Sequence, residues 1–457
     1  MLQEKLPNQS QLNLYFPVLN QILNPKHELM KLSAVIQWHS LEMSLSKKYN
    51  NDMGRPAKPI RLMCSLLILK YLYNLSDEGL IAQWTQNPYY QYFGGFSEFQ
   101  WGQPCASSEL VHFRYRIGRQ GEELILKESI RVHDDLKGGA GQKRRKKVSK
   151  EKQVFSDTTV QEKDITFPTD TKLYKKIVER CRRIARDSGL KVRQSYKRTV
   201  PKLMQAQRFR NHPKNKSKAI RAERKLKTIA GRMLREVDRQ LEGFDRMIYQ
   251  GFIDLANKIL SQQKAGSKKI YSLDEPHVYC MSKGKDWKKY EFGSKVNVLW
   301  GGKSGLIMAV HNCEENVHDS KTLEPVLDQF ERVNEYLPEE CVTDRGFRGK
   351  VDVKGVKVSI PKPAAKNVTK YQKRKIREKF RKRAGIEPII GHLKSDFRLK
   401  RNYLSGINGD HHNLIMSAVG FNIRKWIRCY LEHLKNWLKF ILHYNFQNYC
   451  LNQLLAS

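Results

Sequence analysis

The sequence predicts an α/β protein of several domains, in which a helical amino-terminal region precedes a core built on a mixed sheet. Apolar residues recur at helical spacing up to about residue 135, most clearly from Ile60 to Leu75. From Val154 onward, short segments alternate apolar with small or polar residues, as strands do. The later order is several strands, a helix over 323–337, a short strand ending at Asp344 and a further helix, and this order indicates a mixed α/β core.

The amino-terminal helices allow two interpretations. Ser76 stands as an N-cap and opens a helix that runs through Trp84, and a third helix begins near Ser107 or Ser108 and runs to Gly118. Three short helices with tight turns are compatible with a helix-turn-helix reader of the DNA major groove. An ordinary helical bundle produces the same spacing, and the spacing alone favours the bundle.

The charge composition points to a polyanionic partner. Lys and Arg number 85 against 46 Asp and Glu, a formal net charge of +39. Such a field favours binding of nucleic acid, because each neutralised phosphate releases counterions. No apolar run is long enough to span a membrane, the amino terminus lacks the features of a signal peptide, and the eight cysteines are scattered without a CxxC pair. We therefore expect a cytoplasmic protein that binds nucleic acid and no membrane.

Two segments concentrate the positive charge. Residues 136–153 form a glycine-containing basic linker, which serves as a solvated tether, as an arm that contacts phosphates, or as both. Between residues 171 and 240, 24 Lys and Arg face only 5 Asp and Glu, on segments with helical spacing of apolar residues. Charged runs are usually solvated, but so large an excess would repel itself without an anion, so we favour contact with nucleic acid.

Three acidic residues are candidates for chemistry. Asp157 lies in the first predicted strand, Asp344 ends a later strand, and Glu387 follows on a helix. Sites in α/β proteins form where strands end, and carboxylates are the hard oxygen ligands that Mg²⁺ prefers. Two such ions can activate a water or a 3′-hydroxyl and stabilise the leaving oxygen in an attack on phosphorus. Taken singly, however, an aspartate at a strand end is more often a turn former or a helix cap.

The spacing around Glu387 is more informative. If the segment is one continuous helix, a single stripe of it carries Phe380, Arg383, Glu387 and Lys394. Glu387 could then bind a metal ion, while the cations on either side of it bind DNA phosphates. Gly385 and the proline after Glu387 disfavour an uninterrupted helix, and that proline is also suited to the first turn of a new helix beginning at Glu387.

These motifs resemble those of DDE transposases of bacterial insertion sequences, in the grouping of insertion-sequence families four and five. The family signature Y-x2-R-x3-E-x6-K corresponds here to Phe380, Arg383, Glu387 and Lys394, with phenylalanine in place of the tyrosine. The resemblance covers most of the chain and includes the segments GRPAKPIRL, SDTTV with ITFPTD, KGKDWKKYEFGSKV, DSKTL, VTDRGFRG and IEPIIGHLKSDFRLKRNYLSG.

The resemblance implies an RNase H-like core in which Asp157, Asp344 and Glu387 ligate Mg²⁺, with Mn²⁺ as a substitute. The implied domains are a helical DNA-binding domain at 1–135, a basic linker at 136–153 and a catalytic core made of 154–170 and 266–425. A basic helical insertion at 171–265 interrupts this core, and amphipathic helices follow it at 426–457.

The implied reaction is hydrolysis of phosphodiester bonds at the ends of the element, followed by strand transfer of the freed 3′-hydroxyl into target DNA. The partners are then double-stranded DNA, as terminal inverted repeats and target, and a second copy of the chain in a homodimer on DNA close to the nucleoid. The candidate DNA contacts are Phe380, Arg383, Lys394, Arg345, Lys283 and Lys285. For the last three, a solvated surface cation is an equally good interpretation.

Other polar residues have simpler explanations. We interpret Asp319, the strongest rival acid, as the N-cap of the helix that follows it, with contact with the acidic site as the lesser alternative. His392 is expected on a helix surface, and the adjacent His411 and His412 project in different directions and form no chelate. Two further functions remain open from the sequence: a DNA-binding regulator without catalysis, and a structure-selective nuclease on the same core. Specific binding to short inverted repeats beside the gene would discriminate among them.

Overall fold

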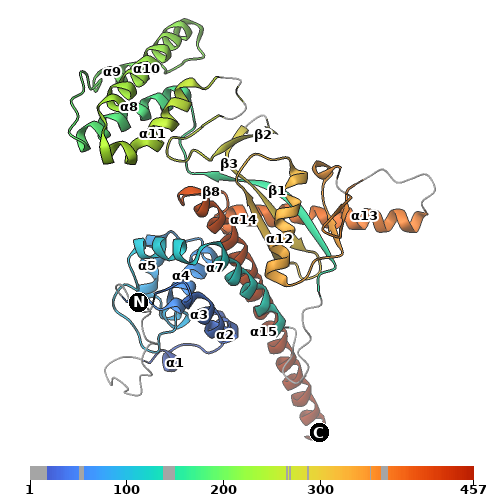
Figure 1. Cartoon of the computed structure of the whole chain (residues 1–457). Helices are drawn as coiled ribbons and strands as arrows, with labels where there is room; N and C mark the ends of the chain where they lie inside the picture. Colours follow the sequence, from blue (N-terminus) through green and yellow to red (C-terminus); the bar gives the residue numbers. More distant parts are fainter. Residues whose placement is uncertain are drawn as a thin grey trace. The chain divides into compact units, whose positions relative to one another are not determined.

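The computed structural model of the chain describes residues 18–50, 56–136, 150–263, 266, 269–285, 288–349, 351–361 and 369–456 (Figure 1). The chain forms two compact units. The first comprises residues 1–161, 295–313 and 317–457, and the second comprises residues 162–294 and 314–316. The acidic residues of interest all belong to the first unit, so its architecture determines the site.

The amino-terminal part of the first unit is helical, as predicted. Its helices are α1 (Leu19–Ile22), α2 (Glu28–Val35), α3 (Trp38–Ser46), α4 (Ile60–Leu72), α5 (Asp77–Gln86), α6 (Pro88–Phe93) and α7 (Ser107–Leu136). Almost every residue of α4 is buried, which explains why its sequence is apolar all round rather than on one face. Ser76 is the N-cap of α5, because its side chain accepts a hydrogen bond from the Gly79 amide, and this prediction is confirmed.

The third helix was predicted to run to Gly118, and this prediction is confirmed, because the backbone of Gly118 is not helical. Its φ of 56° lies in the left-handed region, and a second helical segment of α7 follows it to Leu136. Glycine accommodates this conformation without the penalty that a Cβ atom brings. The two halves therefore form one kinked element, and its second half contributes Ile125, Leu126 and Val132 to the core.

A mixed sheet forms the centre of the fold. Its strand order is β2-β3-β1-β5-β7-β6, with β4 beside β3 and β8 beside β1. Strand β5 is parallel to both β1 and β7, whereas β2, β3 and β4 pair antiparallel in sequence and β6 pairs antiparallel with β7. The strands are β1 (Gln153–Lys163), β2 (Tyr279–Lys285), β3 (Lys288–Gly301), β4 (Ile307–Cys313), β5 (Glu340–Val342), β6 (Asp352–Val353), β7 (Val356–Ser359) and β8 (Arg401–Asn402).

Helices cover this sheet and connect its strands. Helix α12 (Leu323–Asn334) packs on β4, and its buried residues recur at helical spacing. Helices α13 (Lys370–Ala384) and α14 (Ile386–Asp396) follow β7, and α15 (Gly406–Ala456) packs against β4, α4 and α7. A buried cluster joins the sheet, α15 and the amino-terminal helices, so these elements share one core.

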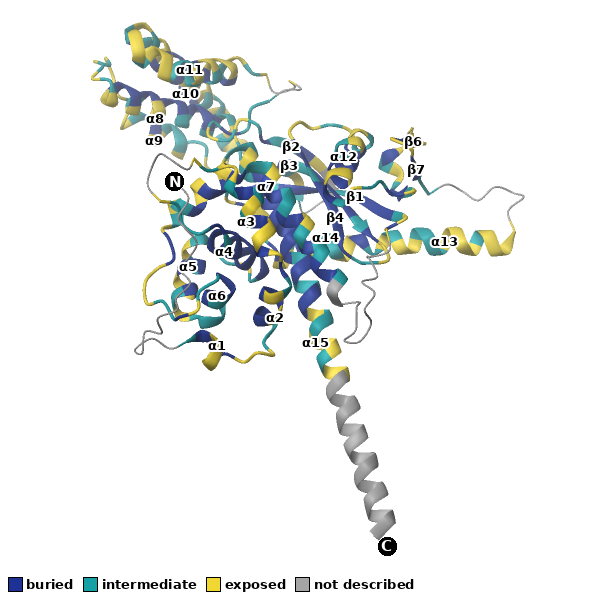
Figure 2. Cartoon of the chain, turned by 60° about the horizontal axis from the view of Figure 1, so that its bottom comes forward, coloured by how far each residue is buried: buried dark blue, intermediate teal, exposed yellow. Residues whose placement is uncertain are grey.

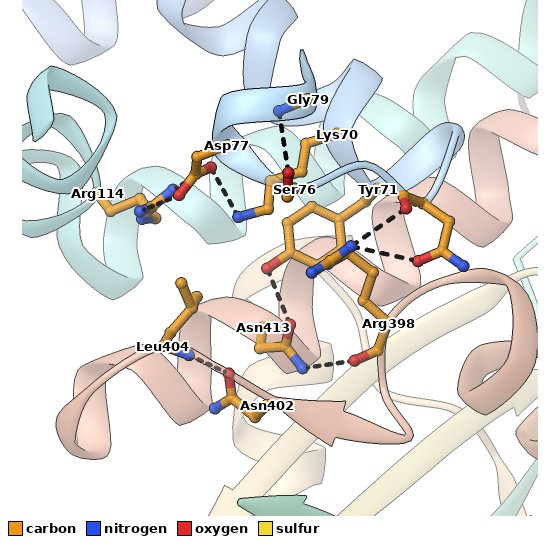
Figure 3. A network of polar contacts seen from close by, with 11 residues as sticks. Lys70, Tyr71, Ser76, Asp77, Gly79, Arg114, Arg398, Asn402, Leu404 and Asn413 are labelled. Atoms are coloured by element: carbon orange, nitrogen blue, oxygen red, sulfur yellow. Dashed lines mark hydrogen bonds and ion pairs between the residues drawn. The ribbon is translucent and has the colours of Figure 1, made fainter. Parts of the chain in front are cut away.

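Polar contacts add to this joint core, as Figure 3 shows. The Tyr71 hydroxyl on α4 donates a hydrogen bond of 3.0 Å to the Asn413 side chain on α15. Asn413 in turn donates to the Arg398 carbonyl oxygen, and the Arg398 guanidinium donates to Asn74. The amino-terminal helices are therefore bonded to the segment that follows α14.

The second unit is a separate helical body. Its helices are α8 (Asp170–Asp187), α9 (Thr199–Gln205), α10 (Pro213–Gln240) and α11 (Gly243–Ser261). Leu226, Ile229 and Met233 of α10 pack with Ile177 and Cys181 of α8 in a core of their own. The Lys and Arg residues lie mostly on the outer faces of these amphipathic helices, and Figure 2 shows much of each helix coloured as exposed.

Among the described residues, we find no helix that is both long and apolar enough to cross a membrane.

Candidate functional site

The topology places Asp157 and Asp344 side by side. Strands β1 and β5 are adjacent and parallel, and Phe155 is paired with Val342. Asp157, within β1, and Asp344, just past the end of β5, each lie two residues after these partners, so the parallel register brings them side by side. This neighbourhood depends on the pairing of two strands that are 187 residues apart in the chain.

Local hydrogen bonds orient both carboxylates. Asp344 caps the single 3₁₀ turn Arg345–Phe347, because its Oδ1 accepts a hydrogen bond of 2.9 Å from the Gly346 amide. Phe347 is completely buried and anchors the turn in the core. The Asp157 Oδ1 accepts a hydrogen bond of 2.9 Å from the Thr158 amide. In each aspartate, Oδ2 then faces the cation described next.

Arg383, near the end of α13, lies between the two aspartates. Its Nη2 is 3.3 Å from Asp157 Oδ2 and 3.9 Å from Asp344 Oδ2. The Arg383 and Asp157 side chains are each 16% exposed, and that of Asp344 is 37% exposed. The Arg383 Nε is buried without a hydrogen-bond acceptor among the described residues. The guanidinium therefore bridges the acids through one end only.

The carboxylates are close enough to affect one another. Burial raises the pKa of Asp157, and the negative charges of Asp344 and Glu387 raise it further. The positive charge of Arg383 and the hydrogen bond from the Thr158 amide lower it. The net result is a raised pKa, because burial outweighs the attraction of the Arg383 charge.

The predicted stripe is divided between two helices. Helix α13 begins with a capping box formed by Thr369 and Gln372, and α14 begins at Ile386, immediately after Gly385. A Cβ atom on Gly385 would lie only 3.0 Å from the Lys382 carbonyl oxygen, so the junction favours glycine. The helix break predicted from Gly385 and Pro388 is thus present, and α14 begins one residue before Glu387, the predicted start.

The residues of the stripe differ in exposure. Phe380, Arg383 and Lys394 are half-buried, whereas Glu387 is exposed in the first turn of α14. A carboxylate at this position also interacts favourably with the helix dipole. The structure brings Glu387 into electrostatic range of Asp157, and it places Lys394 two turns further along α14.

The remaining predicted DNA contacts are less closely tied to the acids. Arg345 is exposed and directly follows Asp344 in the 3₁₀ turn. Lys283 and Lys285 lie in strand β2, and their side chains fall outside the part of the chain whose side chains are described. A DNA contact at each of these three residues remains a prediction.

The donor set suits a hard divalent cation. Asp157, Asp344 and Glu387 supply only carboxylate oxygens, and the first two are brought together by adjacent strands. As the side chains stand, the described residues contain no group of three His, Cys, Asp or Glu arranged to hold a metal ion. Arg383 lies between Asp157 and Asp344 and supplies a positive charge there.

The interpretation of Asp319 as a helix N-cap is wrong. Asp319 begins a separate 3₁₀ turn, Asp319–Lys321, which the His318 side chain caps, and Thr322 precedes α12. The Asp319 carboxylate instead accepts a hydrogen bond of 2.9 Å from Lys295 Nζ on β3. Sequence reasoning identified this acid but had no means of finding its partner, which is 24 residues away.

His392 lies on a helix surface, as predicted. The His392 Nδ1 lies 2.9 Å from Asp396 Oδ2 one turn further along α14, on an exposed face. His412 is buried and hydrogen-bonded to Glu122, and burial lowers its pKa.

Comparisons with known proteins match two segments of the chain. Residues 17–116 match the family model described as "Transposase domain (DUF772)", and residues 265–423 match the model described as "Transposase DDE domain". Asp344 and Glu387 lie within the second match, whereas Asp157 lies outside both. The chain is also 38% identical over 192 residues to the uncharacterized protein ORF8 in the nfe locus of Rhizobium meliloti, covering 42% of this chain and 89% of that protein. No solved structure shows significant similarity to the chain.

Proposed function

This chain belongs to the DDE transposase family, and we propose that it cleaves phosphodiester bonds at the ends of an insertion sequence and joins the freed ends to target DNA. The observation that carries the proposal is the pair of parallel strands that brings Asp157 beside Asp344, with Arg383 of α13 between them and Glu387 of α14 within electrostatic range of Asp157. This arrangement concentrates acidic residues in a chain that is otherwise strongly basic.

In this proposal, Asp157, Asp344 and Glu387 hold the catalytic Mg²⁺, for which Mn²⁺ substitutes. When bound, the divalent cations lower the pKa of an attacking water or hydroxyl and stabilise the leaving oxygen. The side chains orient the site before that event: the Gly346 amide fixes Asp344, and the Thr158 amide fixes Asp157. Arg383 balances the charge of both aspartates while the cations are absent.

Arg383 and Lys394 are proposed to position the DNA backbone, because guanidinium and ammonium groups bind phosphates. Arg345, Lys283 and Lys285 are weaker candidates for the same role. Phe380 replaces the tyrosine of the family signature, so it has no hydroxyl to donate, and we assign it a packing or base-stacking role.

The remaining parts of the chain have expected roles in DNA binding. We propose that the core is RNase H-like, that the basic helices α8–α11 contact DNA backbone, and that sequence is read by side chains of the amino-terminal helices. Holding two ends of an element together requires two copies of the site, so a homodimer on the terminal inverted repeats is expected. The field of a chain with net charge +39 favours residence near the nucleoid.

The test is cleavage of a supercoiled plasmid that carries the gene with its native flanks. Wild type, Glu387→Gln and Glu378→Gln are compared with Mg²⁺ and with EDTA. Glu378 is the matched control, because it lies on α13, pairs only with Arg374 among the described residues and is remote from the aspartates in the contacts it makes.

We expect cuts at the ends of the element that require Mg²⁺ and Glu387 but not Glu378. Equal cleavage by Glu387→Gln and wild type would refute the assigned site. Binding to the ends without cleavage by the wild type would instead indicate a DNA-binding regulator derived from a transposase.

A further inference from the structure

A fourth carboxylate lies next to the proposed catalytic acids. A Cβ atom placed on Gly346 would lie 2.9 Å from Asp319 Oδ2 and 3.0 Å from Asp344 Oδ1. Carboxylate oxygens of both aspartates therefore lie close to the Cα of the same glycine. Gly346 is the residue whose amide holds Asp344, so Asp319 contacts the turn that orients this acid.

Lys295 holds Asp319 in this position. Its Nζ donates one hydrogen bond of 2.9 Å to Asp319 Oδ1 and another of 2.6 Å to the Val317 carbonyl oxygen. The Lys295 side chain is 16% exposed and that of Asp319 is 27% exposed, so the pair is partly shielded from water. An ion pair that is shielded and also hydrogen-bonded to the backbone restrains both side chains better than a surface pair does.

Buried hydrogen bonds connect the Asp319 turn to the strand of Asp157. The Ser156 hydroxyl donates to Asn297 Oδ1 at 2.8 Å, Asn297 Nδ2 donates to the Thr322 hydroxyl at 2.8 Å, and that hydroxyl donates to the Asp319 carbonyl oxygen at 2.7 Å. Ser156, Asn297 and Thr322 are completely buried. A fully paired buried network of this kind rigidifies the elements that it joins.

The alternative is that Asp319 only shapes its own turn. Its carboxylate is not needed for that, because the turn is closed by backbone bonds to the His318 and Asp319 carbonyl oxygens and is capped by the His318 side chain. The two carboxylate oxygens face Lys295 and Gly346 instead. The negative charge of Asp319 is therefore directed toward the Asp344 turn.

We propose that Asp319, held by Lys295, is a positioning residue for Asp344. It acts in two ways: its carboxylate holds the turn at Gly346 in place beside Asp344, and its charge adds to the field that attracts a divalent cation to Asp157 and Asp344. This inference rests on the proposed function for its metal, and it predicts an effect on metal affinity that is measurable without DNA.

The experiment is a titration of the full-length chain with Mn²⁺, followed by electron paramagnetic resonance in the absence of DNA. Asp319→Asn keeps the volume of the side chain and an acceptor for Lys295 but removes the charge. We expect its affinity for Mn²⁺ to fall about tenfold, the lower end of the loss found when an outer partner of a metal ligand is removed. Plasmid cleavage by the same variant should fall by a similar factor, with the KM for DNA unchanged.

Asp328→Asn is the matched control. Asp328 also pairs with a lysine, Lys354, and lies on the adjoining helix α12. Its Mn²⁺ affinity and cleavage should equal those of the wild type. Gly346→Ala is the second variant, because its Cβ atom would press on both carboxylates, and it should weaken Mn²⁺ binding even if Asp319→Asn fails to fold.

The outcomes separate this inference from the proposed function. Wild-type affinity for Mn²⁺ in Asp319→Asn would overturn the role of Asp319, whatever the cleavage assay shows. If Asp319→Asn does not fold, wild-type affinity in Gly346→Ala would overturn it. A wild type that binds Mn²⁺ through Asp344 and cuts no DNA would refute the transposase activity alone. A wild type that binds no Mn²⁺ would overturn both.

Discussion

Replacing Asp77 should destabilise the amino-terminal helices more than any nearby surface change. Asp77 opens α5 and accepts hydrogen bonds from Lys70 Nζ at 2.7 Å and from Arg114 Nη2 at 2.9 Å (Figure 3). The exposed fractions of the Asp77, Lys70 and Arg114 side chains are 14%, 4% and 8%. In Asp77→Asn, two buried cations from α4 and α7 lose their counter-charge.

The magnitude follows from the ionisation of Asp77. Burial favours the neutral acid, but the hydrogen bonds and charges of Arg114 and Lys70 outweigh burial and lower its pKa from 3.8 to about 2. This shift corresponds to about 2 kcal/mol of stabilisation. Removing one member of a buried ion pair costs about 3–5 kcal/mol. Burial already lowers the pKa of Lys70 to about 8, so this lysine can lose its proton in the variant, and we expect the lower end, about 3 kcal/mol.

Hydrogen exchange followed by mass spectrometry measures this cost locally. In Asp77→Asn, amides of α4 and α5 should exchange about a hundredfold faster at pH 7, while the buried core of α10 in the second unit should be unchanged. Glu78→Gln is the control, because Glu78 is the exposed acid next in the chain. Equal exchange in Asp77→Asn and Glu78→Gln would refute the reasoning.

The same pair has a defined pH dependence. Because the folded pKa of Asp77 lies below the unfolded value, its contribution is complete above about pH 4 and is lost as the pH falls from about 4 to about 2. The difference in stability between wild type and Asp77→Asn should shrink over this interval. A constant difference down to pH 2 would show that the charge of Asp77 is not its source.

Three further predictions concern the site. Arg383→Gln should bind Mn²⁺ several-fold more tightly than wild type in a titration, because the cation that bridges Asp157 and Asp344 is gone, yet it should cleave DNA more slowly; weaker Mn²⁺ binding would contradict the competition. Phe380→Tyr should cleave within about twofold of wild type and Phe380→Ala about tenfold more slowly, because ring packing rather than a hydroxyl is used here; a large gain in the tyrosine variant would refute this. Lys394→Ala should lower DNA affinity and reduce the slope of log K against log salt concentration by about one, and an unchanged slope would exclude a phosphate contact.

Much of the local structure was predictable from the chain itself. The N-cap at Ser76 follows from a serine before acidic residues, and the strand around Asp157 follows from alternation. The break at Gly385 follows from the conformational preferences of glycine and proline. The end of the helix at Gly118 was predictable, because a glycine after a run of helical residues signals a helix end, but the second helical segment that follows to Leu136 and packs on α15 was not predicted.

The sequence by itself determined the chemistry that is available: the three acids, the signature around Glu387 and the excess of positive charge are all legible without coordinates. It could not determine that Arg383 bridges Asp157 and Asp344, nor that Asp319 is held by Lys295 against Gly346. Composition and periodicity report on neighbours along the chain, whereas these contacts join residues from strands and helices far apart in it. Only the parallel pairing of β1 with β5 and the packing around it decide which charges meet.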